Sequence, residues 1–303
     1  MTDTQTPQTT AAGTQQPGGP RIREAKWTWE RVWRRYSFAF VTVINLAVFF
    51  TIWELFALYG PIPSLIFPRF TEVVDSLKIG WLGGGNLEGN NNRMLADFVI
   101  VQNFWETLRV YGISMAIAIG FGIPIGLLMG ARKWLDAILS PYVWTLSSLP
   151  RIAIYPILVM FIGIGSEIKY ALVILTAIFP VIINTWAGVK TTEQSLINAA
   201  KMFGASRSQI YRKVILPYTL PFVVTGVQLG LSRGLVGVVL AEFLTGATRF
   251  GGIGWLVFRA ANAFNAPLTY AALLSLAVFA LILVQGTRSM EAKIAPWRQV
   301  SKT

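Results

Sequence analysis

The sequence contains no cysteine and no histidine. Disulfides, thiol chemistry, zinc sites built from these ligands and imidazole acid–base catalysis are therefore excluded. Charge is also scarce, because only 13% of the 303 residues are charged and 54% are hydrophobic. Acidic residues are the rarer charged kind, with 14 Asp and Glu against 26 Lys and Arg. This composition is too apolar for an ordinary soluble protein of this length.

Apolar runs long enough to cross a bilayer recur along the chain instead. They predict an all-α polytopic membrane protein, because a helix pairs all its backbone polar groups within the hydrocarbon. Six spans are expected, at 38–59, 105–130, 138–163, 168–189, 218–246 and 266–287. Pro141, Pro150 and Pro156 in the third span and Pro180 in the fourth predict kinks or local unwinding.

The flanking segments are polar. Residues 1–26 are expected to form a disordered tail, and no signal peptide, because the first apolar run begins only near Phe38 and lacks a clear cleavage site. The aromatic and arginine-rich segment 27–37 predicts an interfacial anchor, with a regulatory or partner-binding role as the alternative. Residues 60–104 form a loop whose Gly- and Asn-rich part, 80–98, suits turns; a flexible excursion and a contact surface for an external partner both fit.

Basic residues set the expected orientation. They gather before the first span, after the second, between the fourth and fifth, and in the C-terminal tail 288–303, whereas the opposite side holds few. The positive-inside rule therefore places both termini and the 190–213 loop in the cytoplasm.

The polar stretch "NAAKMFGASRSQIYRKVILPYTLP" (198–221) separates two of the apolar runs. Gly204 breaks a helix-forming run, and "SRSQ" (206–209) has the capping-box form that opens a new helix. Leu216 and Pro217 are expected to close that second piece, with Pro217 starting the next span. Two short helices joined at a tight, cationic corner suit docking to a cytoplasmic partner; a solvated loop made basic only by topology is the alternative.

This stretch resembles the cytoplasmic EAA signature of ABC-importer permeases, which is Glu-Ala-Ala, three residues, Gly, nine residues, Ile-x-Leu-Pro. Ala199, Ala200, Gly204, Leu216 and Pro217 match, whereas Asn198 replaces the glutamate and Val214 the isoleucine. We call residues 198–217 the EAA segment. Further stretches, "IWELFALYG" (52–60), "FWETLRVYGISMAIAIGFGIPIGLLMG" (104–130), "SLPRIAIYPILVMFIGIGSE" (148–167), "FPVIINTWAGV" (179–189) and "GLVGVVLAEFLTGATRFGGIGWLV" (234–257), resemble the nitrate/sulfonate/taurine type in order and spacing.

The resemblance implies a type I importer permease fold in which the core at 105–287 pairs with a second copy in the bacterial inner membrane. Cytoplasmic ABC ATPase subunits would bind ATP and Mg²⁺, an extracytoplasmic protein would deliver substrate, and this chain would not itself be an enzyme. The chain indeed carries no G-x-x-x-x-G-K-[ST] phosphate loop. The residues implied to contact the ATPase are Asn198, Ala199, Ala200, Lys201, Met202, Phe203, Gly204, Ala205, Ser206, Arg207, Leu216 and Pro217.

Two arginines fall inside expected spans. At 1.5 Å per helical residue, Arg151 lies about 20 Å into the third span and Arg233 about 22 Å into the fifth. They share a depth at which a charge rarely faces lipid. Guanidinium binds carboxylate and sulfonate in a bidentate way, which predicts a cationic lining for an anionic substrate. A structural pair with Glu54 or Glu242 is the alternative, although Glu242 lies about 13 Å along the helix from Arg233.

Other polar residues are weaker candidates for the pathway: Ser147, Ser148, Asn184 and Thr185 near the expected kinks, and Glu242 toward the outer end of the fifth span. Their side chains also commonly bond to their own backbone or between helices. The glycines at 120, 122, 126 and 130 recur at intervals of two or four residues and predict close helix packing rather than ligand binding.

The sequence is thus interpreted as the permease subunit of an ABC importer for a small anion such as nitrate, a sulfonate, taurine or an aromatic acid. A gradient-driven secondary transporter is one alternative, and it would more often show internal repeats with paired broken helices and a core carboxylate. A non-transporting membrane scaffold is another. It would need the EAA segment but no arginines at mid-membrane depth.

Overall fold

The computed structural model describes residues 29–83, 98–163, 165–245 and 251–294, and side chains within these ranges from Phe40 to Gly286. All elements in the described ranges are helices, which confirms the all-α prediction. The chain divides into two compact units, residues 1–52 and 53–303. The helices are α1 (Trp29–Tyr59), α2 (Phe70–Leu82), α3 (Val99–Ala131), α4 (Lys133–Ser148), α5 (Arg151–Ile162), α6 (Ser166–Lys190), α7 (Gln194–Met202), α8 (Arg207–Ile210), the π-helix η1 (Tyr211–Ile215), α9 (Leu216–Thr245), α10 (Ile253–Asn262) and α11 (Ala266–Ile294).

Several expected boundaries were wrong. Residues 29–37 continue without a break into the span at 38–59, because α1 runs from Trp29 to Tyr59, and their place at the membrane interface stays a prediction. The loop expected at 60–104 contains α2, and α3 already begins at Val99. At the other end, α11 extends seven residues past the expected span, to Ile294. The expected tail at 1–26, and all but a few residues of the Gly- and Asn-rich stretch 80–98, lie outside the described residues.

Five stretches within the helices are long and apolar enough to cross a membrane, namely 40–59, 99–131, 166–190, 207–245 and 266–286. The third expected span, 138–163, is not one helix: α4 and α5 meet at an angle of 105°. The break falls at Leu149, which is extended (φ −67°, ψ 136°) because the following Pro150 disfavours the α conformation there. Pro141, Pro156 and Pro180 lie inside continuous helices, so of the four prolines only Pro150 separates two helices.

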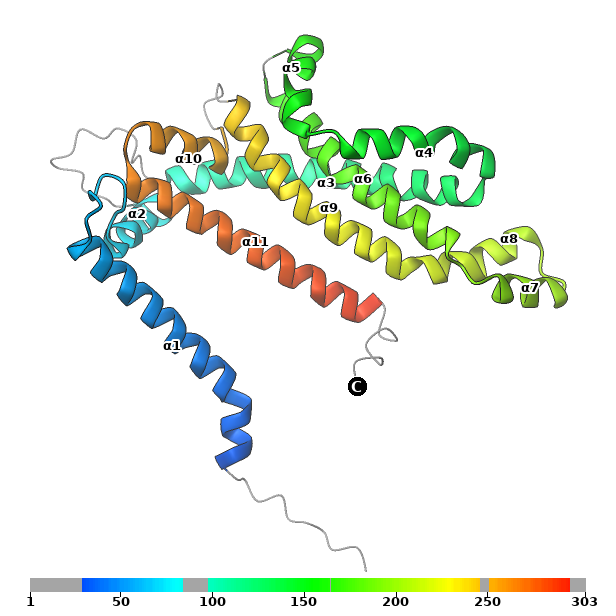
Figure 1. The fold of residues 1–303 in the computed structure, drawn as a ribbon, viewed down its shortest axis with the longest axis horizontal. Coiled ribbons are helices and arrows are strands. Elements are labelled where there is room, and N and C mark those ends of the chain that lie inside the picture. The colour runs from blue at the N-terminus through cyan, green and yellow to red at the C-terminus, as the bar shows by residue number, and fades with distance from the viewer. Residues whose placement is uncertain (1–28, 84–97, 164, 246–250, 295–303) are drawn as a thin grey trace, which may run out of the picture. The chain divides into compact units, whose positions relative to one another are not determined.

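Helix α6 packs closely between α3 and α9 (Figure 1). The approach depends on glycine, because a Cβ on Gly126 of α3 would lie 2.7 Å from the carbonyl oxygen of Ile182 in α6. A Cβ on Gly226 of α9 would lie 2.9 Å from the Asn184 side chain in α6. Small residues that let backbones approach are typical of helix association in membranes. The packing role expected for the α3 glycines holds for 122, 126 and 130 but not for Gly120, which faces open space.

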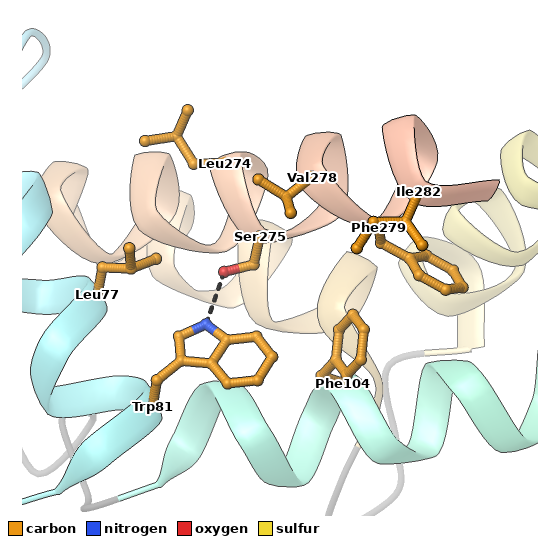
Figure 2. Close-up of a pocket in the computed structure, with 8 residues that line it drawn as sticks. All are labelled: Leu77, Trp81, Phe104, Leu274, Ser275, Val278, Phe279 and Ile282. Carbon is orange, nitrogen blue, oxygen red and sulfur yellow. Dashed lines mark hydrogen bonds between the residues drawn. The ribbon is translucent and has the colours of Figure 1, made fainter. Parts of the chain in front are cut away.

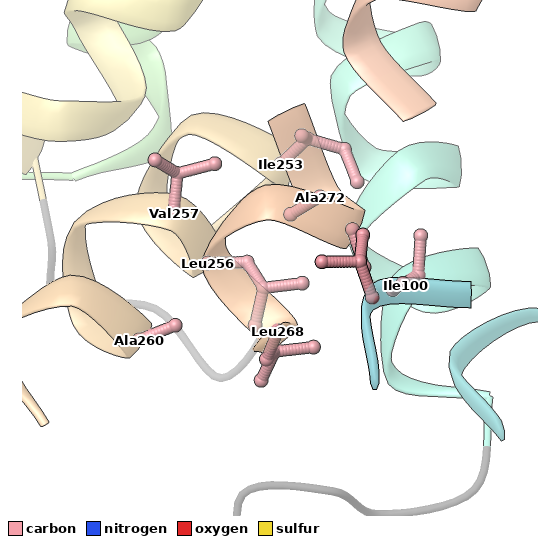
Figure 3. Packing of buried hydrophobic residues seen from close by; sticks show 9 residues of the cluster. Ile100, Ile253, Leu256, Val257, Ala260, Leu268 and Ala272 are labelled. Atoms are coloured by element: carbon pink, nitrogen blue, oxygen red, sulfur yellow. The ribbon is translucent and has the colours of Figure 1, made fainter. Parts of the chain in front are cut away.

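A second group of helices, α2, α10 and α11, packs against the Val99 end of α3. Their buried apolar side chains form one cluster (Figure 3), to which α10 contributes Ile253 and Leu256 and α11 contributes Leu268 and Ala272. Ile100 of α3 joins the cluster and is fully buried. These short helices were not predicted, because α2 has only 13 residues and α10 only 10, and neither contains a long apolar run.

Trp81 ties α2 to both neighbours. Its indole N–H donates to the hydroxyl of Ser275 in α11 over 3.0 Å, and its ring lies 5.2 Å from that of Phe104 in α3 (Figure 2). An apolar cavity of about 440 Å³ opens beside Trp81, between α2, α3 and α11. The one hydroxyl that lines this cavity, Ser275, also donates to the carbonyl of Ala271, so the cavity offers little polar chemistry.

The glycine contacts predict a position-specific effect of added volume. We expect Gly126→Val to lower the stability of the detergent-solubilised protein by about 1–3 kcal/mol, because the new side chain must displace Ile182 and Thr185. Fluorescence-detected gel filtration after stepwise heating measures the effect. Gly120→Val is the control, because nothing lies within 4 Å of its Cβ position on the same helix. Equal losses in both variants would contradict the packing role.

Candidate functional site

The corner of the EAA segment is built as the sequence predicts. Helix α7 ends at Met202, and Gly204 adopts the left-handed conformation, with φ +75°. The N–H of Gly204 donates to the carbonyl of Lys201 over 2.9 Å, and that of Ala205 donates to the carbonyl of Ala200 over 3.0 Å. This pair of bonds is a Schellman motif, in which glycine takes the αL position without a Cβ penalty.

Ser206 begins the second helix with the predicted capping box. Its hydroxyl accepts from the N–H of Gln209 over 3.3 Å, and the Gln209 side chain accepts from the N–H of Ser206 over 2.7 Å. The expectation that Leu216 and Pro217 close this helix was wrong. The chain continues from α8 through the π-helix η1 into α9, where the N–H of Leu216 bonds to the carbonyl of Tyr211. The wider π turn accommodates Pro217, which has no N–H to donate.

The EAA segment exposes two large apolar side chains, with Met202 88% and Phe203 91% exposed. Four cations of the same segment are also exposed, namely Lys201, Arg207, Arg212 and Lys213. A recess of about 390 Å³ lies in the elbow between α7 and α8, reaching from Ala200 to Val214. Asn198 is exposed, and its side-chain carbonyl accepts from Gln194 over 3.0 Å, so the position of the signature glutamate is held by a neutral bond within α7.

Arg151 lies where α5 packs on α6 and borders α9, the helix that carries Arg233. Arg151 is the first residue of α5 and lines a small recess with Thr176 of α6 and Gly237 of α9. Its guanidinium interacts electrostatically with that of Arg233, an exposed residue one helical turn before Gly237. The straight third span from which the depth of Arg151 was calculated is not formed, because the structure bends there by 105°.

The alternative ion pairs with Glu54 or Glu242 are not formed within the described chain. Among the residues that the structure describes, neither Arg151 nor Arg233 lies within salt-bridge distance of a carboxylate. Glu54 accepts from the N–H and hydroxyl of Thr71, at 3.3 and 3.1 Å. One guanidinium nitrogen of Arg151, Nη2, is buried and has no hydrogen-bond partner within the described chain.

Ser147, Ser148 and Asn184, which were also candidates for the pathway, form hydrogen bonds within their own helices. Ser147 and Ser148, at the end of α4 next to the bend, both donate to the carbonyl of Trp144 over 2.9 Å. Asn184 donates to the carbonyl of Pro180 within α6 over 2.8 Å. It packs on α9 two turns nearer the EAA segment than Thr176, so it does not join the arginine pair. These bonds match the intrahelical alternative that the sequence left open.

Glu242 is fully buried in a polar network at the N-terminus of α10. Its carboxylate accepts from the hydroxyl of Thr107 and from the N–H of Gly254, each over 2.7 Å. The Thr107 oxygen in turn accepts from the N–H of Ile253 over 2.8 Å, and the Asn103 carbonyl accepts from Gly252 over 3.2 Å. Three side chains from α3 and α9 thus satisfy the first N–H groups of α10, which a helix cannot pair itself.

The same network includes a buried cation. Lys169 of α6 is 1% exposed and donates to the carbonyl of Gly251 over 3.2 Å, and its ammonium attracts the Glu242 carboxylate. Gly252 has φ +94°, and a Cβ there would collide with that carboxylate. The network therefore fixes α10 to α3, α6 and α9, and this position of Glu242 was not predicted.

The sequence carried only a partial signal for this network. Lys169 in an apolar span and the run "GGIG" (251–254) were both visible, but their proximity to Asn103 and Thr107 depends on tertiary packing. Within the described ranges, no group of three acidic side chains gathers closely enough to hold a metal ion.

Comparison with known proteins gives a consistent result. Residues 122–296 match the family model described as "Binding-protein-dependent transport system inner membrane component". The chain is 32% identical to the taurine transport system permease protein TauC of Escherichia coli (strain K12) over 275 residues, which cover 91% of this chain and 94% of that one. It is 26% identical over 255 residues to the putative aliphatic sulfonates transport permease protein SsuC of Bacillus subtilis (strain 168), covering 83% and 85%.

Solved structures share the fold. A chain of the inward-facing MetNI methionine ABC transporter superposes with a TM-score of 0.58 at 20% identity, covering 65% of this chain and 97% of that one. A chain of a bacterial alginate ABC transporter, solved with its periplasmic protein, superposes with a TM-score of 0.52 at 16% identity, covering 87% and 98%. At these identities the likeness concerns the fold alone.

The polar network predicts that Thr107 is costly to replace. Thr107→Val keeps the shape but leaves a Glu242 oxygen and the N–H of Ile253 unpaired, so we expect a loss of about 2–4 kcal/mol from two unsatisfied buried groups. A thermal scan of the purified protein in detergent measures it as a lower unfolding temperature.

Thr185→Val is the matched control. Thr185 is fully buried like Thr107, but its hydroxyl has no hydrogen-bond partner in the described chain. The same substitution there removes an unsatisfied group and should leave the unfolding temperature unchanged or raise it. If Thr185→Val destabilises as much as Thr107→Val, the loss reflects general packing and not the network.

Proposed function

Since the chain belongs to the family of binding-protein-dependent transport system inner membrane components, the permease subunits of ABC importers, we propose that it works by docking a separate ATPase at the EAA segment. Two copies enclose the substrate pathway, and cytoplasmic ABC ATPase subunits that bind ATP and Mg²⁺ drive it. An extracytoplasmic binding protein delivers the substrate. The chemical step of ATP hydrolysis belongs to the ATPase, so this chain is not an enzyme.

One observation carries the docking role: the EAA segment presents Met202 and Phe203 almost fully exposed on a corner of defined geometry. Large apolar side chains on an otherwise polar surface are typical of a protein contact. The Schellman motif and the capping box hold the corner in one shape, which lowers the entropy lost on binding. The four exposed cations of the segment suit such a contact as well, because charge adds orientation and association rate.

The link from this contact to the membrane is a continuous helix. Because α8, η1 and α9 follow one another without a break, a displacement of the docked corner moves α9 as well. Tyr211 at the junction donates to the carbonyl of Leu127 in α3 over 3.4 Å, so α3 is connected to the same point. Coupling through packed, rigid elements is the physical requirement for alternating access.

The orientation follows from charge. The basic residues of the EAA segment and of both terminal segments favour the cytoplasmic side, so both termini lie inside and α6 ends there. We place the chain in the bacterial inner membrane as a multi-pass protein on this ground. The relatives named for taurine and aliphatic sulfonates support a small anion as the substrate.

Purification of the tagged chain from its native membrane in mild detergent, with mass spectrometry of its companions, tests the docking role. We expect an ATPase with a phosphate-binding loop to accompany the wild type. Phe203→Asn should reduce the amount recovered, because loss of a central apolar anchor typically costs about 2 kcal/mol or more of binding.

Phe264→Asn is the matched control. Phe264 is 67% exposed beyond the other end of α9, and its φ of +56° is a conformation that asparagine tolerates. This variant should retain the ATPase at the wild-type level. If wild type repeatedly purifies without any ATPase, the proposed function fails, and a gradient-driven transporter becomes the better account.

A further inference from the structure

We propose that Arg151 and Arg233 form an oxyanion subsite that binds the charged end of the transported substrate, a sulfonate or carboxylate group. This inference rests on the proposed function and deepens it, because it assigns residues and a chemical class of ligand to the pathway. The subsite lies at the contact of α5 with α9, on the outer side of the bend at Pro150.

The fold places the two guanidinium groups near enough for their like charges to interact. The Tyr155 hydroxyl donates to the carbonyl of Leu244 over 2.8 Å, which fixes α5 against α9. Arg151 lines a small recess together with Thr176 of α6 and Gly237 of α9. Arg233 is one turn away on the same face of α9, and the like charges interact unfavourably.

The described chain supplies no counter-charge. Glu242 is engaged by Thr107 and Gly254, and Glu54 by Thr71. Across the ranges that the structure describes, the salt bridges join Lys78 to Asp75, Arg109 to Glu106 and Lys190 to Asp136, so neither Arg151 nor Arg233 takes part in one. Two unmatched charges in a membrane-spanning region indicate a function that supplies the missing anion.

The hydrogen bonding of Arg151 also requires an acceptor. Its Nη2 is buried without a partner, and guanidinium in a protein stays charged. The hydroxyls nearest along the chain, Ser147 and Ser148, donate to Trp144. A tetrahedral sulfonate or a planar carboxylate offers two or three acceptor oxygens, enough to bridge both guanidinium groups in the fork geometry that arginine prefers.

Arg151 and Arg233 differ in how far their side chains are exposed. Arg233 is exposed on the surface of the isolated chain, together with the neighbouring Ser232, whereas Arg151 is half-buried. A charged side chain in this part of a membrane helix does not face lipid stably, so Arg233 points toward the space between two permease copies. The exposed Arg233 would then contact the anion first, and the half-buried Arg151 would hold it in the bound position.

The test uses the full complex purified with its ATPase and placed in lipid nanodiscs. Ethanesulfonate is the probe, and its binding is measured by thermal shift at constant ionic strength against chloride. Variants are Arg151→Gln, Arg233→Gln and Arg151→Lys, with Arg259→Gln as the control. Arg259 is an exposed arginine of α10 stacked on Trp255, outside the pair.

We expect wild type and Arg259→Gln to bind ethanesulfonate alike, and each glutamine variant to bind about tenfold more weakly or worse, since each loses a charge-assisted bond. Arg151→Lys keeps the charge and should fold like wild type, but it cannot make the bidentate contact, so its binding should also fall.

Two results would overturn the subsite. One is unchanged ethanesulfonate binding in all three variants at the pair. The other is a lower unfolding temperature of the variants in the absence of ethanesulfonate, together with the same rise in unfolding temperature when ethanesulfonate is added. That result would mean that the arginines pair with a carboxylate elsewhere in the assembly. ATPase recovery with the same variants separates the two claims, because a normal yield leaves the proposed function standing while the subsite fails.

Discussion

The close approach of α6 to α3 and α9 is the constraint on which the rest of the structure depends. Lipid chains are as apolar as leucine, so these helices cannot associate by removing apolar surface from water. They associate by fitting together, and the fit needs glycine at Gly126, Gly226 and Gly230, where a Cβ would press on the α6 backbone or its side chains. The bent α4–α5 pair and the α10–α11 pair then attach to this three-helix unit.

Because α9 belongs to that unit, it connects the features that matter for transport. Its α8–η1 extension carries the exposed corner, its middle carries Arg233, and its far end carries Glu242, which fixes α10. At 1.5 Å per residue, about 40 Å of helix separate Ser206 from Arg233. A helix held on one face by glycine contacts moves as a rigid body more readily than it bends, so a change at the corner reaches the arginine as a displacement.

Short sequence motifs correctly predicted structure that depends on neighbouring residues. They did not predict structure that depends on contacts between distant segments. Gly204 and Ser206 specify the corner through bonds that span at most five residues, so the sequence predicts it correctly. Pro150 breaks its span whereas Pro141 does not, and no rule within either helix separates the two. Likewise α2 and α10 are too short to show a membrane signal, and the partners of Glu242 lie 12 and 135 residues away, at Gly254 and Thr107.

The charged side chains within the membrane helices fall into two groups. One group has its hydrogen-bond and charge partners inside the described chain, and the other does not. Glu242 and Lys169 attract each other electrostatically, and each also has a backbone hydrogen-bond partner within the chain. Removing one of these charges would leave its buried partner groups without hydrogen bonds and so lower the stability of the fold. Arg151 of α5 and Arg233 of α9 interact electrostatically, and within the described residues neither forms a salt bridge with a carboxylate. The anion subsite proposed above rests on this difference, because an anion would supply the acceptor that the buried Nη2 of Arg151 lacks in the described chain.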